Sequence, residues 1–183
     1  MSRPTHQGPL RRLTLCALFA AVLCVLSPIA VPIDPIPVSL GLLGVLLTAA
    51  TLPPSLSFTA VTVFLALGIC GLPVFGGGMS GATVLVGPTG GYLWAYLFAA
   101  PTVSLLCKRS NSFWHSFFAC LAGVAICYAC GTLQFVLLTG TPLLHALPLT
   151  VLPFLPFDIL KSLFATHLGR TLKKHIHRYE VKK

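Results

Sequence analysis

Long apolar stretches, separated by short breaks, recur along the whole chain. The first extends from Leu13 to about Val31 and stops at a segment with prolines at positions 32, 35 and 37. Proline lacks the backbone donor and clashes with the preceding turn, so a helix cannot continue through that segment. Five further runs follow, at residues 38–52, 55–69, 91–106, 113–138 and 156–174. The pattern therefore predicts six helices.

The breaks between these runs differ in character. Pro53 and Pro54 separate the second run from the third, and both runs are short beside the 17–25 residues that usually span a bilayer. Residues 68–91 are rich in glycine and are predicted to form a long, partly ordered loop. Residues 139–155 contain three prolines and are predicted to form a re-entrant or interfacial loop.

Composition places these helices in lipid. Hydrophobic residues make up 56% of the chain and charged residues 8%, and the mean hydropathy is +0.92. A water-soluble protein of this size needs far more charge to cover its surface. We therefore expect an all-α integral membrane protein, with six transmembrane helices in one membrane domain at residues 13–174.

The formal net charge of +9 does not indicate nucleic-acid binding, because the Lys and Arg residues sit at the ends of apolar runs. With six spans, eleven of the twelve Lys and Arg residues lie on the side of the membrane that holds both termini, and the twelfth is Lys161. The positive-inside rule then predicts a protein of the cytoplasmic (inner) membrane with a cytoplasmic segment 1–12 and a basic cytoplasmic tail 175–183. The three remaining loops meet at the outer face.

Asp158 and Lys161 give the sharpest indication of function. Both lie in the last apolar run, and their i,i+3 spacing puts them on one face of a helix. A charged side chain at membrane depth costs about 2.5–3.5 kcal/mol on insertion scales, so it pairs or faces a cavity. Two interpretations stay open, a ligand-binding pair and a purely structural ion pair, and the first is favoured.

Other chemistry is less well supported. The glycine-rich segments let the backbone approach a ligand, but no Gly-Lys-Ser/Thr sequence follows that would indicate a nucleotide site. The seven cysteines fit best as small apolar residues within helices, including the C-x-x-C pair at Cys127 and Cys130. We expect no metal, no cofactor and no enzymatic activity.

Three motifs in order give the chain a specific resemblance. They are Gly-Leu-Pro-Val-Phe at Gly71–Phe75, Gly-Pro-Thr-Gly-Gly-Tyr at Gly87–Tyr92, and Pro-Phe-Leu-Pro-x-Asp-x-x-Lys at Pro153–Lys161. Together they resemble the BioY family, the biotin-specific S components of energy-coupling factor (ECF) transporters. The resemblance implies a six-helix fold that binds biotin near its outer face, under a lid formed by the loop between the third and fourth helices.

The resemblance also implies roles for individual residues. Asp158 and Lys161 would hold polar groups of biotin, and this fits their chemistry: an ionised Asp accepts from ureido N–H groups, and Lys donates to a carbonyl or carboxylate. The remaining residues implied in ligand binding fall into two groups. At the start of the fourth helix they are Thr89, Gly90, Gly91 and Tyr92, and in the lid they are Phe75, Gly77 and Gly78.

Partners follow from the same resemblance. Ala17 and Ala21 form a small-xxx-small pair in the first helix, which suits either docking of a membrane-embedded coupling subunit or packing within the chain. Two ATPase subunits would supply the nucleotide hydrolysis, and lipids would surround the helices. The alternative function is a stand-alone secondary transporter or channel for another small organic anion or vitamin, with Asp158 and Lys161 lining a proton or substrate pathway.

Overall fold

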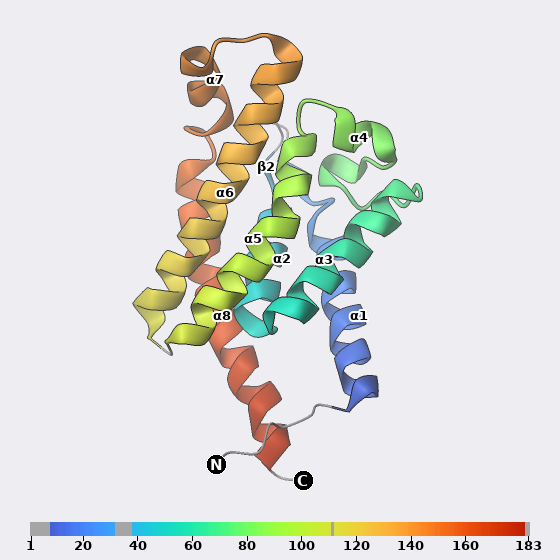
Figure 1. Cartoon of the computed structure of the whole chain (residues 1–183), viewed down its shortest axis with the longest axis vertical. Helices are drawn as coiled ribbons and strands as arrows, with labels where there is room; N and C mark the ends of the chain where they lie inside the picture. The colour runs from blue at the N-terminus through green and yellow to red at the C-terminus, as the bar shows by residue number, and fades with distance from the viewer. Residues whose placement is uncertain (1–7, 32–37, 111, 182–183) are drawn as a thin grey trace.

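The computed structural model describes residues 8–31, 38–110 and 112–181. Within these ranges the fold is all-α apart from one pair of two-residue strands, as predicted. Six longer helices follow the six apolar runs (Figure 1): α1 (Pro9–Leu26), α2 (Gly41–Thr51), α3 (Pro54–Ile69), α5 (Gly90–Arg109), α6 (Phe113–Thr139) and α8 (Leu155–Val181). The shorter elements are β1 (Ala30–Val31), β2 (Val38–Ser39), the 3₁₀ turn η1 (Gly76–Gly78), α4 (Ala82–Val86) and α7 (Leu143–Thr150).

Three of the described helices, α1, α5 and α6, are long and apolar enough to cross a membrane. A fourth span is possible if α7 and α8 count as one broken span, since the two helices meet at a bend of 52°. The two remaining long elements, α2 and α3, are apolar but shorter, with 11 and 16 residues. These helices make the chain a multi-pass membrane protein.

The first helix ends earlier than the sequence predicts. It stops at Leu26 instead of continuing to Val31. Ser27 still has helical backbone, but Pro28 lacks the N–H that would make the next helical hydrogen bond. The chain then extends, and Ala30–Val31 pairs antiparallel with Val38–Ser39. The proline-rich break at residues 32–37 lies outside the described residues.

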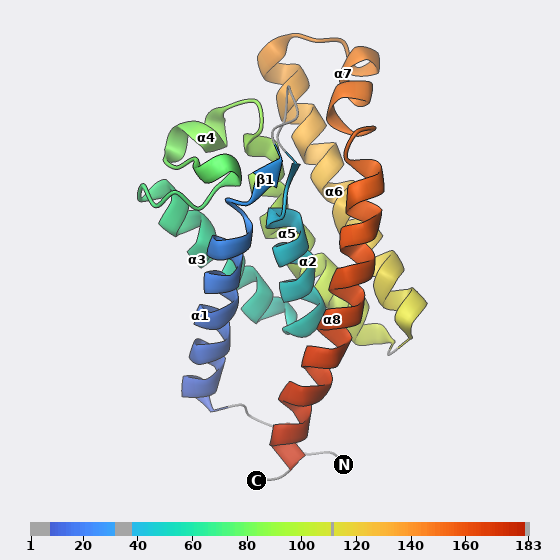
Figure 2. The ribbon, with the colours of Figure 1, turned by 180° about the vertical axis from the view of Figure 1, so that it is seen from behind.

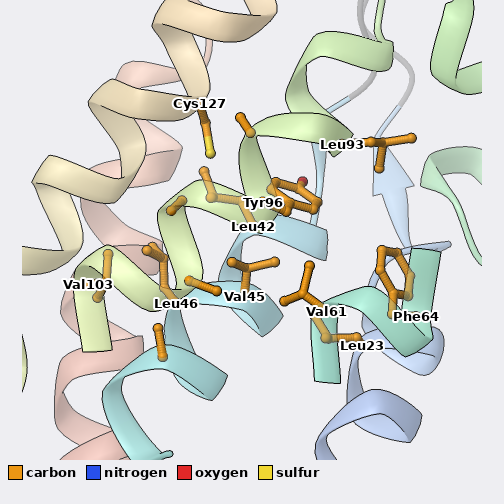
Figure 3. Packing of buried hydrophobic residues seen from close by; sticks show 14 of the residues in the cluster. Leu23, Leu42, Val45, Leu46, Val61, Phe64, Leu93, Tyr96, Val103 and Cys127 are labelled. Carbon is orange, nitrogen blue, oxygen red and sulfur yellow. The ribbon is translucent and has the colours of Figure 1, made fainter. Parts of the chain in front are cut away.

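Helix α2 lies at the centre of the bundle, between α1 and α8 when the molecule is seen from behind (Figure 2). Nine of its eleven residues are buried. Its side chains Val45 and Leu46 meet those of α3 and α5, including Val61 and Val103, at the middle of the core (Figure 3). Irregular backbone at membrane depth is tolerated where protein surrounds it. The surrounding helices therefore accommodate both the short helix α2 and the extended residues that precede it.

One end of the molecule carries most of the described basic residues. Helix α1 begins and α8 ends there (Figure 1), and Arg11 Nη2 donates to the carbonyl oxygen of Ile176 at 2.7 Å. Helix α5 reaches the same end with Lys108 and Arg109 in its last turn. The sequence prediction that these residues gather on one side agrees with this arrangement.

The opposite end is more structured than predicted. The glycine-rich loop contains η1 and α4, and the expected loop 139–155 contains α7. Helix α7 forms despite Pro148, because its fixed φ suits a helix and the proline removes only one backbone donor. Two of these elements, η1 and α4, contribute Gly76 and Val84 to the lining of the candidate site.

Candidate functional site

A pocket lies in the half of the molecule that contains α4 and α7. The space between its walls is about 680 Å³, which includes the part open to solvent. The lining is mostly aromatic and aliphatic, with polar groups gathered at one side. It consists of Ser39, Leu42, Phe75, Gly76, Met79, Val84, Thr89, Tyr92, Leu93, Tyr96, Cys127, Tyr128, Phe154, Asp158 and Lys161.

The predicted pair of charges lies at the polar side of this pocket. Asp158 is 3% exposed and Lys161 is 8% exposed, and Lys161 Nζ lies 2.8 Å from Asp158 Oδ1. Asp158 stands in the first turn of α8, where the helix dipole favours a negative charge. Asp158 N also donates to the carbonyl of Phe154 at 2.8 Å, which fixes the backbone from which the carboxylate projects.

Two further groups complete the pair, and the sequence did not single out either. The Tyr128 hydroxyl donates to Asp158 Oδ2 at 2.8 Å, and Lys161 Nζ donates to the carbonyl oxygen of Ser39 at 2.8 Å. A tyrosine hydroxyl in an apolar helix needs a partner, which was the available signal for Tyr128. The Ser39 carbonyl belongs to the extended backbone before α2, and no residue type could have revealed it.

The paired groups keep capacity for a ligand. Each carboxylate oxygen has two lone pairs, and each accepts one hydrogen bond from the described residues. The Lys161 ammonium has three protons, two of which go to Asp158 and Ser39. The site therefore offers acceptors and one strong donor side by side, at the head of an apolar pocket.

Phe75, predicted in the lid, is fully buried and lines the pocket. Its ring packs edge-on against Phe64 of α3, with ring centroids 5.7 Å apart. A Cβ at Gly68 would overlap the Phe75 ring, so glycine at position 68 is what lets the ring fold back onto α3. The loop closes further through Gly81 N, which donates to the carbonyl of Gly68 at 2.8 Å.

Gly77 and Gly78 are exposed and do not line the pocket, whereas the preceding Gly76 does. Both have positive φ, 71° and 77°, a backbone conformation that other residues adopt rarely. Gly78 N donates to the carbonyl of Phe75 at 2.9 Å, and Gly77 N donates to that of Pro28 at 3.2 Å. In this structure the two glycines shape the turn that holds Phe75 and Gly76 over the pocket.

The second motif divides in the same way. Thr89 and Tyr92 line the pocket, and Gly90 and Gly91 are buried behind it. A Cβ at Gly90 would overlap the Leu85 carbonyl, and one at Gly91 would overlap the Cys130 carbonyl on α6. The glycines thus let the start of α5 approach its neighbours. The Tyr92 hydroxyl donates to the Thr150 carbonyl at 2.8 Å, which ties α7 to α5.

Gln134 of α6 anchors this region, and no sequence motif pointed to it. Its Nε2 donates to the carbonyl oxygens of Leu85 at 2.9 Å and Gly87 at 2.7 Å. These carbonyls belong to the end of α4 and the turn into α5. One side chain from the interior of the bundle therefore holds the loop that carries Thr89.

Two aromatic residues close in sequence to Tyr92 and Asp158 lie outside the pocket lining. Trp94 is 43% exposed and Phe157 is 49% exposed, and neither lines the pocket. Ala17 and Ala21 are both exposed on the outer face of α1, away from the pocket. They share that face with Leu18 and Val25, which are 56% and 68% exposed.

A helical membrane domain built around an apolar pocket with one buried ion pair is the architecture of a membrane transport component. The comparisons give its family. The sequence profile of the BioY family matches residues 1–178. This chain belongs to the BioY family, whose members are transporter subunits and not enzymes.

Individual relatives agree with this assignment. The chain is 38% identical to biotin transporter BioY2 of Lactococcus lactis subsp. cremoris, over 91% of this chain and 94% of that protein. It is 36% identical to biotin transporter BioY of Thermotoga maritima, over 90% and 97%. Among solved structures, it matches the S-component for biotin from an ECF-type ABC transporter, with a TM-score of 0.85 and 28% identity over 94% and 95% of the two chains.

Proposed function

We propose that this protein captures biotin in the pocket at Asp158 and Lys161 and passes it across the membrane as the substrate-binding component of an ECF-type transporter. The observation that carries the proposal is the buried ion pair with spare hydrogen-bonding capacity at the head of an apolar pocket. Biotin has the matching layout, with a polar ureido group, a sulfur ring and an aliphatic tail that ends in a carboxylate.

The chemistry supports one division of roles. The free lone pairs of Asp158 accept from ureido N–H groups, and the remaining proton of Lys161 goes to a carbonyl or carboxylate oxygen. Charge-assisted hydrogen bonds of this kind are shorter and stronger than neutral ones. Tyr92 and Phe75 flank the ring and tail, and Thr89 supplies a further hydroxyl. Gly77, Gly78, Gly90 and Gly91 act through the backbone positions they allow.

The orientation proposed is six spans at residues 13–174, with both ends of the chain in the cytoplasm and the pocket near the outer face. The clustering of Arg11, Arg12, Lys108 and Arg109 at the end opposite the pocket supports it, since Lys and Arg are enriched in cytoplasmic loops. In this arrangement segment 1–12 and the basic tail 175–183 are cytoplasmic, and the membrane is the inner membrane of the cell.

Energy for uptake comes from partners in this proposal. The exposed face of α1 around Ala17 and Ala21 docks a membrane-embedded coupling subunit, which connects two ATPase subunits. Small side chains on an outward face allow another helix to approach closely within lipid. The relation to an S-component from an ECF-type transporter supports a complex of this kind.

Calorimetry of the detergent-purified chain tests the proposal. Biotin should bind with one site per chain, whereas riboflavin and thiamine should give no heat beyond dilution. Asp158→Asn should remove most of the biotin signal, and a change at an exposed position that does not line the pocket, Thr59→Ala in α3, should leave it unchanged. Binding of thiamine or riboflavin in place of biotin would overturn the assignment.

A further inference from the structure

A second hollow region lies at the basic end of the molecule, away from the biotin pocket. It consists of two adjoining cavities with empty volumes of about 840 and 820 Å³, both partly open to solvent. They share the lining residues Ala50, Cys107 and Lys173, so we treat them as one paired cavity. Its walls come from α1, the junction between α2 and α3, the end of α5, the start of α6 and residues 170–176 of α8.

The paired cavity is strongly basic. Lys173 lines both parts, Arg170 and Lys174 line the first, and Lys108 lines the second. Among the described residues, none that lines either part is acidic. The Lys173 side chain is half-buried and forms no hydrogen bond or ion pair with the described part of the chain. Arg170 lies over the Phe113 ring, with Cζ 5.8 Å from the centroid, which orients its guanidinium.

Most neutral polar side chains of the walls have already used their protons. Ser104 Oγ donates to the Leu52 carbonyl, Ser116 Oγ donates to the Ser112 carbonyl at 3.1 Å, and the Cys107 thiol points to the Ser116 carbonyl. Ser110 Oγ accepts from Ser112 N at 3.2 Å, so the donors left for an occupant are its hydroxyl proton and the cationic side chains. A ligand of this cavity must accept hydrogen bonds and carry negative charge.

The second part of the cavity adds an apolar requirement. Leu15, Leu52, Pro53 and Ile176 line it beside Lys108 and Lys173. Near the first part, Trp114 and Phe118 of α6 are each 63% exposed, and aromatic residues of this kind favour the membrane–water interface. An occupant that satisfies both features has an anionic head and an apolar body.

We propose that the paired cavity is a binding site for the phosphate headgroup of an anionic phospholipid, with Lys173 as the central contact and Lys108 beside it. Basic pockets between membrane helices commonly hold such headgroups, because phosphate oxygens accept several charge-assisted hydrogen bonds at once. The acyl chains lie along the apolar wall of Leu15 and Leu52. This site is separate from the biotin pocket and does not depend on what that pocket binds.

The test is lipid binding to the full chain purified in detergent, followed by native mass spectrometry and by thermal unfolding. Phosphatidylglycerol should bind and raise the unfolding temperature, and phosphatidylcholine with the same acyl chains should not. Each ammonium near the surface contributes on the order of a fivefold change in affinity, so Lys173→Gln should bind about fivefold more weakly and Lys108→Gln/Lys173→Gln about 25-fold more weakly. Lys173→Arg should retain binding.

Arg12→Gln is the matched control, because Arg12 is exposed at the same end but lines neither part of the cavity. It should change the affinity less than twofold; a loss equal to that of Lys173→Gln would mean diffuse surface attraction and overturn the site.

Glycerol phosphate, which lacks acyl chains, should compete poorly, and equal competition would make this a free-phosphate site. The Lys108→Gln/Lys173→Gln variant could instead bind lipid normally and fail to assemble with the coupling subunit. That result would overturn the lipid site and identify an acidic protein segment as the occupant. Circular dichroism identifies any variant that fails to fold, and the comparison of Lys173→Gln with Lys173→Arg then decides the question.

Discussion

The hydroxyl of Tyr128 and the carboxylate of Asp158 are joined by a 2.8 Å hydrogen bond between α6 and α8. The bond ends on Oδ2, while Lys161 occupies Oδ1 at the same distance. Two donors on two different oxygens fix the plane of the carboxylate. Because Asp158 is buried, this plane decides which way its remaining lone pairs face.

Removal of that hydroxyl should weaken biotin binding without removing either charge. Tyr128→Phe deletes one hydrogen bond to an ionised group, worth about 1.5–3 kcal/mol, and frees the carboxylate to turn. We expect affinity for biotin to fall by at least about tenfold in calorimetry, with the fold intact by circular dichroism. Unchanged affinity would mean that Lys161 alone orients the carboxylate.

The ion pair itself should be needed for both stability and binding when only one partner is removed. Asp158→Asn or Lys161→Ala leaves the other charge buried without its partner, which typically costs about 3–5 kcal/mol of folding free energy. Each single variant should therefore unfold at a lower temperature and bind biotin much more weakly. Thermal unfolding and calorimetry on the same samples measure the two effects.

A double variant separates the structural role from the ligand role. Asp158→Leu/Lys161→Leu removes both charges, and apolar replacement of a buried pair is often neutral or stabilising. It should recover most of the stability lost in the single variants while biotin binding stays absent. If biotin binding recovers together with stability, the pair serves only the fold and the proposed ligand contacts are wrong.

The glycines of the second motif offer a different test, because their backbone neighbours are close. Gly91→Ala would place a Cβ against the Cys130 carbonyl on α6, and overpacking of this kind costs about 1–3 kcal/mol. We expect a lower unfolding temperature, with biotin affinity reduced only in proportion to the lost stability. Gly8→Ala is the control, since nothing lies within 4 Å of its Cβ position. A Gly91→Ala protein of full stability with abolished binding would instead indicate direct contact with the ligand.

Much of the fold could be predicted because lipid constrains the sequence so strongly. Backbone groups in a bilayer must be satisfied within the protein, so each apolar run had to form a helix, and each of the six did. Helix ends were less predictable. Residues 30–31 look apolar enough to continue α1, yet they form a strand, and the loops around positions 82–86 and 143–150 contain helices that tertiary packing supports.

The site was predictable where its residues are chemically unusual. A charged pair in an apolar run is conspicuous, and Asp158 and Lys161 do meet at 2.8 Å in the pocket. The hydrogen-bond partners of this pair could not be predicted, because one is the backbone carbonyl of Ser39 and the other is Tyr128, a residue type common in apolar helices. Glycine motifs were ambiguous for a further reason: the same residue permits close approach to a ligand or to a helix, and only the folded structure distinguishes the two.

The exposed face of α1 gives the last prediction, which concerns transport and not binding. Ala17→Trp adds a large side chain to an outward-facing position far from the pocket lining, so the purified protein should bind biotin as before. If that face docks the coupling subunit, the indole should block close approach and biotin uptake by cells should fall severalfold. Ala125→Trp makes the same change on an exposed position of α6 and should leave uptake unchanged. Equal loss of uptake in both variants would point to a general membrane-insertion defect, and loss of binding in Ala17→Trp alone would show that α1 packs within the chain through this face.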